Sequence, residues 1–290
     1  MTTHLIPLLI EPEQLKQLLT QQFDVNQQSG QQQPAPLSDK RLIVDLGKPE
    51  TYAKAHIPSA IHLDYSQIVS LQKPVMGLLP DADTLSQVFS SIGLTHDTHV
   101  IAYDDEGGGR AARLLWTLDA IGHEKASLLN GGIGAWYNEG HSTDTVPVEK
   151  TTSEYQATII DGPVADQQYI RANLNNSAVA LLDSRSPEEF RGIKKFAARA
   201  GRIPGAVNLD WLNVMDQSRN MRLKPESELR ILMEECGLTD DKTIITYCQT
   251  HHRSALTYFV LKQLGYPNIK GYPGSWSDWG NNEDLPIETG

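Results

Sequence analysis

Cysteine is scarce in this chain of 290 residues, which contains only Cys236 and Cys248. Two cysteines cannot build a disulfide framework or a cysteine-rich metal site. The histidines outside residues 248–253 share no spacing typical of zinc ligands. We therefore expect no metal and no other cofactor, and the question becomes whether either thiol is reactive.

Long apolar runs and an export signal are also lacking. No apolar stretch approaches the ~20 residues that a membrane-spanning helix needs. The first 22 residues contain Pro7, Glu11, Pro12 and Glu13, where a signal peptide would have a basic start and an apolar segment. We expect a cytoplasmic protein without a membrane partner.

Positive charge is in deficit. The chain has 25 Lys and Arg against 36 Asp and Glu, which gives a net charge of −11 and a pI near 5.2. A surface of that sign repels nucleic acids, so no nucleic-acid partner is expected. The remaining composition is that of a soluble globular protein, and the length suits two domains.

An internal repeat at offsets of 138 to 146 residues organises the chain. The matched segments are 42–45 with 181–183, 49–52 with 187–190, 56–64 with 202–210, 93–95 with 237–239, 101–103 with 245–247, Gly131-Gly132 with Pro273-Gly274, and Trp136 with Trp279. Copies of this size indicate a duplicated domain. We predict domains at residues 1–144 and 161–290, joined by a linker at 145–160.

Each copy alternates short apolar runs with amphipathic stretches. Strands are predicted at 42–46, 100–103, 179–183 and 243–247, and helices at 82–92, 111–121, 226–236 and 254–264. This alternation predicts an α/β fold in which each domain has a mainly parallel sheet with helices on both faces. The glutamine-rich stretch 21–36 is expected to be a loop.

The chemistry is predicted at one turn between a strand and a helix. Cys248 directly follows the strand predicted at 243–247, at the sheet edge where α/β proteins bind ligands. Backbone N–H groups and the start of the next helix attract anions there and lower the pKa of a thiol. The segment therefore predicts a nucleophilic cysteine in an anion-binding loop, whose other members are Gln249, Thr250, His251, His252, Arg253 and Ser254.

Cys236 has the opposite character. It continues the helical spacing of Leu229, Leu232 and Met233, which indicates packing in the core.

The length of the Cys248 loop also indicates which anion it binds. Four residues separate Cys248 from Arg253, one fewer than in cysteine phosphatases, so the loop suits a terminal sulfur better than a phosphate.

Two further motifs carry a resemblance to a known family. Residues 52–60 (Tyr-Ala-Lys-Ala-His-Ile-Pro-Ser-Ala) and 272–279 (Tyr-Pro-Gly-Ser-Trp-Ser-Asp-Trp) are similar to the two signatures of the rhodanese family, with Ser59 for the usual Gly and Asp278 for the usual Glu. From Leu42 to Trp279 the chain resembles the tandem-domain sulfurtransferases. The loop Cys-Gln-Thr-His-His-Arg looks like that of a bacterial rhodanese.

The resemblance implies a reaction and its partners. The loop from Cys248 to Arg253 would be the active site, and Cys248 would take a persulfide sulfur from thiosulfate or another sulfane-sulfur donor. Cyanide or a thiol acceptor would then remove that sulfur. In the first copy Asp104 occupies the place of the cysteine, so the first domain is predicted to be non-catalytic.

Alternatives remain at this stage. A 3-mercaptopyruvate sulfurtransferase is the main alternative, although the loop lacks the Gly-Ser pattern of that group; a rhodanese-fold phosphatase and a persulfide carrier are more remote.

Several residues near the predicted site depart from the family pattern or have an open role. Thiosulfate enzymes have a substrate-binding Arg where this chain has Glu189. His251 and His252 are adjacent, so at most one is expected to face the sulfur. The side chains of Gln249 and His251 are expected to tolerate substitution.

The second copy also contains a basic insert. Phe190 and Arg202 are twelve residues apart, whereas the matching Tyr52 and His56 are four apart. The insert and its end contribute Arg191, Lys194, Lys195, Arg199 and Arg202 without an acidic residue. These cations are predicted to steer an anionic donor toward Cys248, and an ordinary solvated loop is the alternative.

Overall fold

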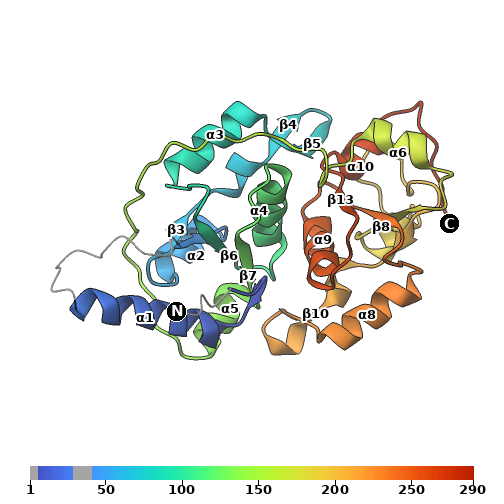
Figure 1. Ribbon diagram of the computed structural model, residues 1–290. Coiled ribbons are helices and arrows are strands. Elements are labelled where there is room, and N and C mark those ends of the chain that lie inside the picture. The colour runs from blue at the N-terminus through green and yellow to red at the C-terminus, as the bar shows by residue number, and fades with distance from the viewer. Residues whose placement is uncertain (1–5, 29–40) are drawn as a thin grey trace.

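The computed structural model describes residues 6–28 and 41–290 and consists of two α/β lobes that lie side by side (Figure 1). All strand pairs in the two main sheets are parallel. Helices cover both faces of each sheet, because buried apolar side chains line both faces. The predicted α/β fold class is confirmed.

The first domain has a sheet of strand order β1-β7-β6-β2-β3. Its strands are β1 (Leu9–Ile10), β2 (Arg41–Asp45), β3 (Ile61–His62), β6 (His99–Tyr103) and β7 (Ala126–Leu129), with the hairpin β4 (Ser70–Gln72) and β5 (Val75–Leu78) outside the sheet. Its helices are α1 (Pro12–Gln28), α2 (Pro49–Lys54), α3 (Ala82–Ser91), α4 (Gly109–Ala120) and α5 (Gly132–Asn138), with a 3₁₀ turn at Tyr65–Ile68.

The second domain repeats this plan with the order β13-β12-β8-β9. Its strands are β8 (Val179–Asp183), β9 (Val207–Asn208), β12 (Thr243–Tyr247) and β13 (Ile269–Gly271), with the hairpin β10 (Met215–Asp216) and β11 (Arg222–Leu223). Its helices are α6 (Gln167–Asn173), α7 (Pro187–Phe190), α8 (Glu226–Glu235), α9 (Arg253–Gln263) and α10 (Ser275–Trp279), with 3₁₀ turns at Trp211–Val214 and Gln217–Arg219. Residues 139–166 between the two sets form no helix or strand, and both predicted domain limits lie in this segment.

Period-two alternation explains why the central strands are buried on both faces. In β12, Ile244 packs into the cluster beneath α8 and α9, and its neighbour Ile245 packs into the cluster on the opposite face with Trp276 and Trp279.

The duplication is also visible in equivalent hydrogen bonds of the two domains. The Tyr103 hydroxyl accepts a hydrogen bond from the N–H of Ile57 at 3.1 Å, and the Tyr247 hydroxyl accepts one from Ile203 at 3.2 Å.

One local prediction needs correction. Helix α1 extends to Gln28, so the predicted loop at 21–36 is wrong for residues 21–28, and residues 29–36 lie outside the described part. Glutamine is a good helix former, and the buried side chains of Leu15 and Leu19 anchor the preceding turns of the helix.

Within the described ranges, no helix combines the length and the apolar character needed to cross a membrane.

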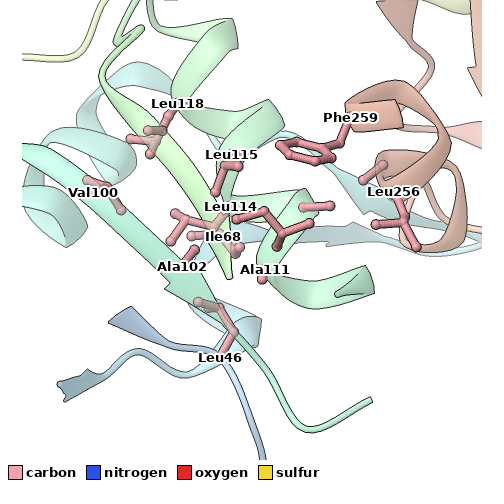
Figure 2. Close-up of a cluster of buried hydrophobic side chains, with 14 of the residues drawn as sticks. Leu46, Ile68, Val100, Ala102, Ala111, Leu114, Leu115, Leu118, Leu256 and Phe259 are labelled. Atoms are coloured by element: carbon pink, nitrogen blue, oxygen red, sulfur yellow. The ribbon is translucent and has the colours of Figure 1, made fainter. Parts of the chain in front are cut away.

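The two domains share one apolar core. Helices α4 and α9, which are equivalent in the two copies, pack against each other across the interface. Figure 2 shows Leu114 and Leu115 of α4 facing Leu256 and Phe259 of α9. This shared core fixes the first domain against the loop that precedes α9.

Each hairpin extends to the other domain. The N–H of Met76 in β5 donates to Ser277 Oγ of α10 at 3.0 Å, and the N–H of Leu223 in β11 donates to Asn130 Oδ1 at 2.8 Å. The approach of β5 to the segment after Cys248 is so close that a Cβ on Gly77 would lie 2.2 Å from the carbonyl oxygen of Thr250. The first domain therefore forms part of the surroundings of the predicted active loop.

Candidate active site

Cys248 lies where β12 ends and the polar loop before α9 begins, as predicted. Its side chain is fully buried, with 0% exposure, whereas Gln249, Thr250, His252 and Arg253 are partly exposed. Full burial is also typical of a structural cysteine, so burial alone does not distinguish the two roles. The groups around the sulfur distinguish a reactive cysteine from a structural one.

Ser275 at the start of α10 anchors the loop from behind. Its hydroxyl oxygen accepts hydrogen bonds from the N–H groups of Cys248 at 3.2 Å and His251 at 3.0 Å, and it donates to the carbonyl of Tyr272 at 2.8 Å. Ser275 has a φ of +51°, in the left-handed region. No sequence motif indicated this role.

Ser275 also corrects the predicted repeat. The N–H of Trp276 donates to the carbonyl of Cys248 at 3.0 Å, and the N–H of Ile133 donates to that of Asp104 at 3.1 Å. Gly132 is therefore equivalent to Ser275, one residue later than the sequence match with Gly274. The short glycine motif allowed this one-residue slip, which the hydrogen bonds resolve.

Arg253 is held by Glu189 in a bidentate pair. Its Nη1 lies 2.7 Å from Glu189 Oε2, and its Nη2 lies 2.9 Å from Oε1. Glu189 is nearly buried at the third position of α7, in a capping box with Ser186. Glu189 therefore orients the cation of the active loop, at the position where thiosulfate enzymes place an Arg of their own.

The electrostatic balance favours the Cys248 thiolate. Burial on its own raises the pKa of the thiol, but the Arg253 guanidinium, the Ser254 hydroxyl and the amides of Ser254 and Thr250 outweigh it and lower the pKa to about 7. Arg113 and Tyr65 from the first domain also lie within electrostatic range of the sulfur. At neutral pH a large fraction of this thiol is the nucleophilic thiolate.

The two histidines have different environments. His251 is fully buried with a φ of +53°, its Nδ1 lies 2.8 Å from Ser254 Oγ, and its ring packs edge-on against Trp116. Burial, followed by the charge of Arg113, keeps the pKa of His251 well below its ordinary value, so the ring is neutral. Free variation of His251, expected from the sequence, does not fit this environment.

His252 faces the first domain instead. Its Nε2 is hydrogen-bonded to Glu106 Oε1, and its ring lies near those of Tyr65 and Trp211. Arg110 pairs with the other oxygen of Glu106 at 3.3 Å. The acidic loop of the first domain therefore contacts the active loop directly.

The acidic loop of the first domain also holds a buried carboxylate at the position equivalent to Cys248. Asp104 is 1% exposed, and its Oδ1 accepts the N–H groups of Glu106 at 3.0 Å and Gly108 at 2.8 Å. Its Oδ2 accepts those of Arg110 at 2.9 Å and Ala111 at 3.0 Å. The carboxylate thus fills a cradle of backbone amides.

The ionisation of Asp104 follows from this geometry. Burial, and then the charge of Glu106, raise its pKa, while the amides of Ala111, Glu106 and Gly108 oppose the rise. Four donors already occupy the acceptor positions of the two oxygens, so a proton would have to displace one of the amides. The four amides therefore favour the ionised side chain against the upward pKa shift that burial causes.

Cys236 is placed apart from this site. Its sulfur lies 3.8 Å from the carbonyl of Asn208, and its side chain packs against the core beside α8. Burial, together with the charge of Glu235, raises the pKa of this thiol. The two cysteines therefore differ in the sign of their pKa shift.

The basic insert divides into structural and exposed cations. Arg199 donates to the carbonyls of Leu285, Trp279 and Asn282, and Arg202 pairs with Glu288 at 3.3 Å, so both hold the C-terminal segment. Arg191 Nε donates to the carbonyl of Pro187 at 3.2 Å. Lys194 and Lys195 are exposed. The insert borders the active loop, because Gln249 Nε2 donates to the carbonyl of Phe196 at 3.1 Å.

These observations define a two-domain α/β protein in which one copy holds a cysteine, and the other a carboxylate, at the same turn. The model of the rhodanese-like domain matches the chain twice, over residues 24–139 and 166–282. The chain therefore belongs to the rhodanese family and has two rhodanese-like domains.

The similar proteins extend over most of the chain. The thiosulfate sulfurtransferase of Pseudomonas aeruginosa is 39% identical over 283 residues, which are 98% of this chain and 97% of that protein. The thiosulfate sulfurtransferase of Azotobacter vinelandii is 40% identical with the same coverage. The sulfur carrier protein TtuD of Thermus thermophilus is 33% identical over 82% of this chain and 87% of its own.

A solved structure is also similar. The anaerobic ergothioneine biosynthesis enzyme from Chlorobium limicola superposes with a TM-score of 0.83 and 24% sequence identity. The match covers 98% of this chain and 70% of that chain. At this identity the similarity establishes the fold alone.

The lowered pKa of Cys248 predicts the pH at which its thiol titrates. Its thiolate absorbance near 240 nm, measured as the difference from the Cys248→Ala variant, is expected to rise with a midpoint near pH 7 because the folded-state pKa is about 7. Arg253→Gln removes the charge that lowers the pKa of Cys248 most and should move that midpoint upward by about one pH unit or more. Arg230→Gln, at an exposed arginine of α8, is the control and should leave it in place. An unchanged midpoint in Arg253→Gln would contradict this electrostatic account.

Proposed function

We propose that this protein is a thiosulfate sulfurtransferase that uses Cys248 as its sulfur carrier. The Cys248 thiolate attacks the outer sulfur of thiosulfate, the sulfur–sulfur bond of the donor breaks, and sulfite leaves with the electron pair. The anionic persulfide is then attacked at its outer sulfur by cyanide or by a thiol acceptor. This step releases thiocyanate or the new persulfide and regenerates the thiolate.

One observation carries the proposal: in the first domain the Asp104 carboxylate fills a cradle of backbone amides at the turn that is equivalent to the one where Cys248 would hold an anionic persulfide. The amides that bind Asp104 lie two, four, six and seven residues after it. Thr250 and Ser254, whose amides lower the pKa of Cys248, lie two and six residues after the cysteine. Two of the four donor positions around Asp104 therefore recur around Cys248.

The chemical shapes also correspond. In aspartate an anionic oxygen is bonded to the atom next to Cβ, and in cysteine persulfide an anionic sulfur is bonded to the atom next to Cβ. A loop whose amides bind the first anion has donors in place for the second, allowing for the longer sulfur bonds. The relatives from Pseudomonas aeruginosa and Azotobacter vinelandii, which bear the name thiosulfate sulfurtransferase, support the same donor.

The proposal predicts a covalent adduct at one cysteine. After incubation with thiosulfate the intact mass should rise by ~32 Da, one sulfur atom, and cyanide should reverse the gain. Cys248→Ala should abolish both the gain and the turnover, because Cys236 has a raised pKa and packs, partly buried, against the core. Cys236→Ala is the matched control and should keep both. A gain that persists in Cys248→Ala would contradict the assignment.

The exposed lysines of the insert are proposed to capture the donor. Thiosulfate is a dianion, and Lys194 and Lys195 are exposed cations of the insert that borders the active loop of an acidic protein; Lys194 also lies 3.8 Å from the exposed carboxylate of Glu188. Arg199 and Arg202 are excluded from this role because their guanidinium groups hold the C-terminal segment. Steering of this kind changes the rate of capture and leaves the bond-breaking step unaffected.

The steering proposal predicts a salt-dependent defect. The double variant Lys194→Ser/Lys195→Ser should lower kcat/KM for thiosulfate by about threefold or more at low salt. The difference should disappear near 1 M salt, where exposed charges are screened beyond ~3 Å. Lys125→Ser, at an exposed lysine before β7 in the first domain, is the matched control. Equal kcat/KM values for the double variant and the wild type at low salt would show that the insert is an ordinary solvated loop.

A further inference from the structure

Arg113 is a buried cation of the first domain that binds the active loop of the second. It lies on α4 with 0% exposure, and its Nη1 donates to the carbonyls of Thr250 and His251, each at 3.3 Å. Its Nη2 donates to the carbonyls of Gly77 at 2.8 Å and Leu78 at 3.2 Å. Two of its four acceptors therefore belong to the loop that follows Cys248.

A buried charge is costly unless it is compensated, so its position requires an explanation. Within the described part of the chain, Arg113 forms no ion pair with a carboxylate, and its charge is balanced by these carbonyl dipoles and by the ring of Trp116, 4.7 Å away. An apolar residue at this interface would avoid the desolvation cost. The cation is therefore retained at a cost to stability.

The two copies differ at this position. Arg113 lies nine residues after Asp104, and the residue nine after Cys248 is Thr257 on α9. Thr257 forms its hydrogen bonds within its own domain, with Ser184 and Ser254. The guanidinium is thus present on α4, where it reaches the loop of the other domain, and the equivalent position of α9 holds a hydroxyl that stays within its own domain.

The peptide geometry connects Arg113 to the sulfur. In a planar trans peptide the N–H points away from the C=O, so a donor on the carbonyl of His251 directs the N–H of His252 to the opposite side. The corresponding amide in the first loop, that of Gly108, donates to Asp104 Oδ1 at 2.8 Å. A cation on the carbonyl also polarises the peptide and strengthens its N–H as a donor.

We propose that Arg113 is a positioning residue for sulfur transfer: the first domain uses its guanidinium to hold and polarise the Thr250–His252 backbone, so that the loop amides stabilise the anionic sulfur on Cys248. The persulfide part of this statement rests on the proposed function. Arg113 does not touch the reacting atoms. The first domain, although it lacks a cysteine, thereby takes part in the activity of the second.

The test compares two variants at Arg113 with an interface control. Arg113→Met removes the charge and nearly preserves the volume, whereas Arg113→Lys keeps the charge but loses the planar fork. Lys262→Met is the interface control. It removes the ion pair between Lys262 of α9 and Asp119 of α4, which are 2.6 Å apart, and does not touch the loop. Three quantities are measured: the melting temperature, the 240 nm titration midpoint of Cys248, and the lifetime of the thiosulfate-derived persulfide.

Arg113→Met should raise the titration midpoint by about one pH unit and shorten the persulfide lifetime about tenfold, as expected for the loss of one hydrogen bond to a charged group. Arg113→Lys should fall between Arg113→Met and the wild type. Lys262→Met should lower the melting temperature without moving the other two quantities.

Wild-type midpoints and lifetimes in both Arg113 variants would overturn the proposal. If Arg113→Met does not fold, Arg113→Lys decides, and a wild-type midpoint in that variant would overturn it too. The titration needs no sulfur donor. Failure of the wild type to gain sulfur would therefore refute the proposed function separately, while the midpoint still decides the role of Arg113.

Discussion

Convergence of backbone amides on one buried point is the interaction on which the rest of this structure depends. A strand that ends into a tight loop and a helix directs several N–H groups inward, and such a point requires an anion. Hydrogen bonds to a charged group contribute about 1.5–3 kcal/mol each. Four of them offset the several kcal/mol that desolvation of one carboxylate costs, so the cradle at Asp104 is stable while fully buried.

Duplication followed by divergence explains how the two cradles differ. In the first copy the group that fills the cradle is the carboxylate of Asp104, which is part of the chain. In the second the anion is a thiolate, which arises because Arg253, held by Glu189, and the loop amides lower the pKa of Cys248 against the effect of burial. The first copy has no cysteine at this turn but supplies the hairpin, Glu106 and Arg113 that surround the second loop.

The sequence predicted the fold and the position of Cys248 at the end of β12 well, because both are encoded locally. Strands β8 and β12 have the predicted limits, and the helices differ from theirs by one or two residues. What it could not predict are contacts between distant segments. Glu189 appeared as a missing Arg, although it is the partner of Arg253, 64 residues away. Arg199 and Arg202 were expected to steer anions, but the C-terminal segment uses their donors. The roles of Ser275 and Arg113 could not be read from the sequence, although Ser275 lies in the motif at 272–279, since these roles exist only after the loop, α10 and the first domain are brought together.

The central claim is that the two loops hold the same kind of anion in the same way. The most direct measurement is a crystal structure of the protein after incubation with thiosulfate. We predict that the outer sulfur on Cys248 lies within hydrogen-bonding distance of the amides of Thr250, His252 and Ser254, which correspond to three of the four amides that bind Asp104; the fourth, that of Ala255, donates to the carbonyl of His252 at 3.2 Å. An outer sulfur directed away from these amides, or one attached to Cys236, would contradict the account.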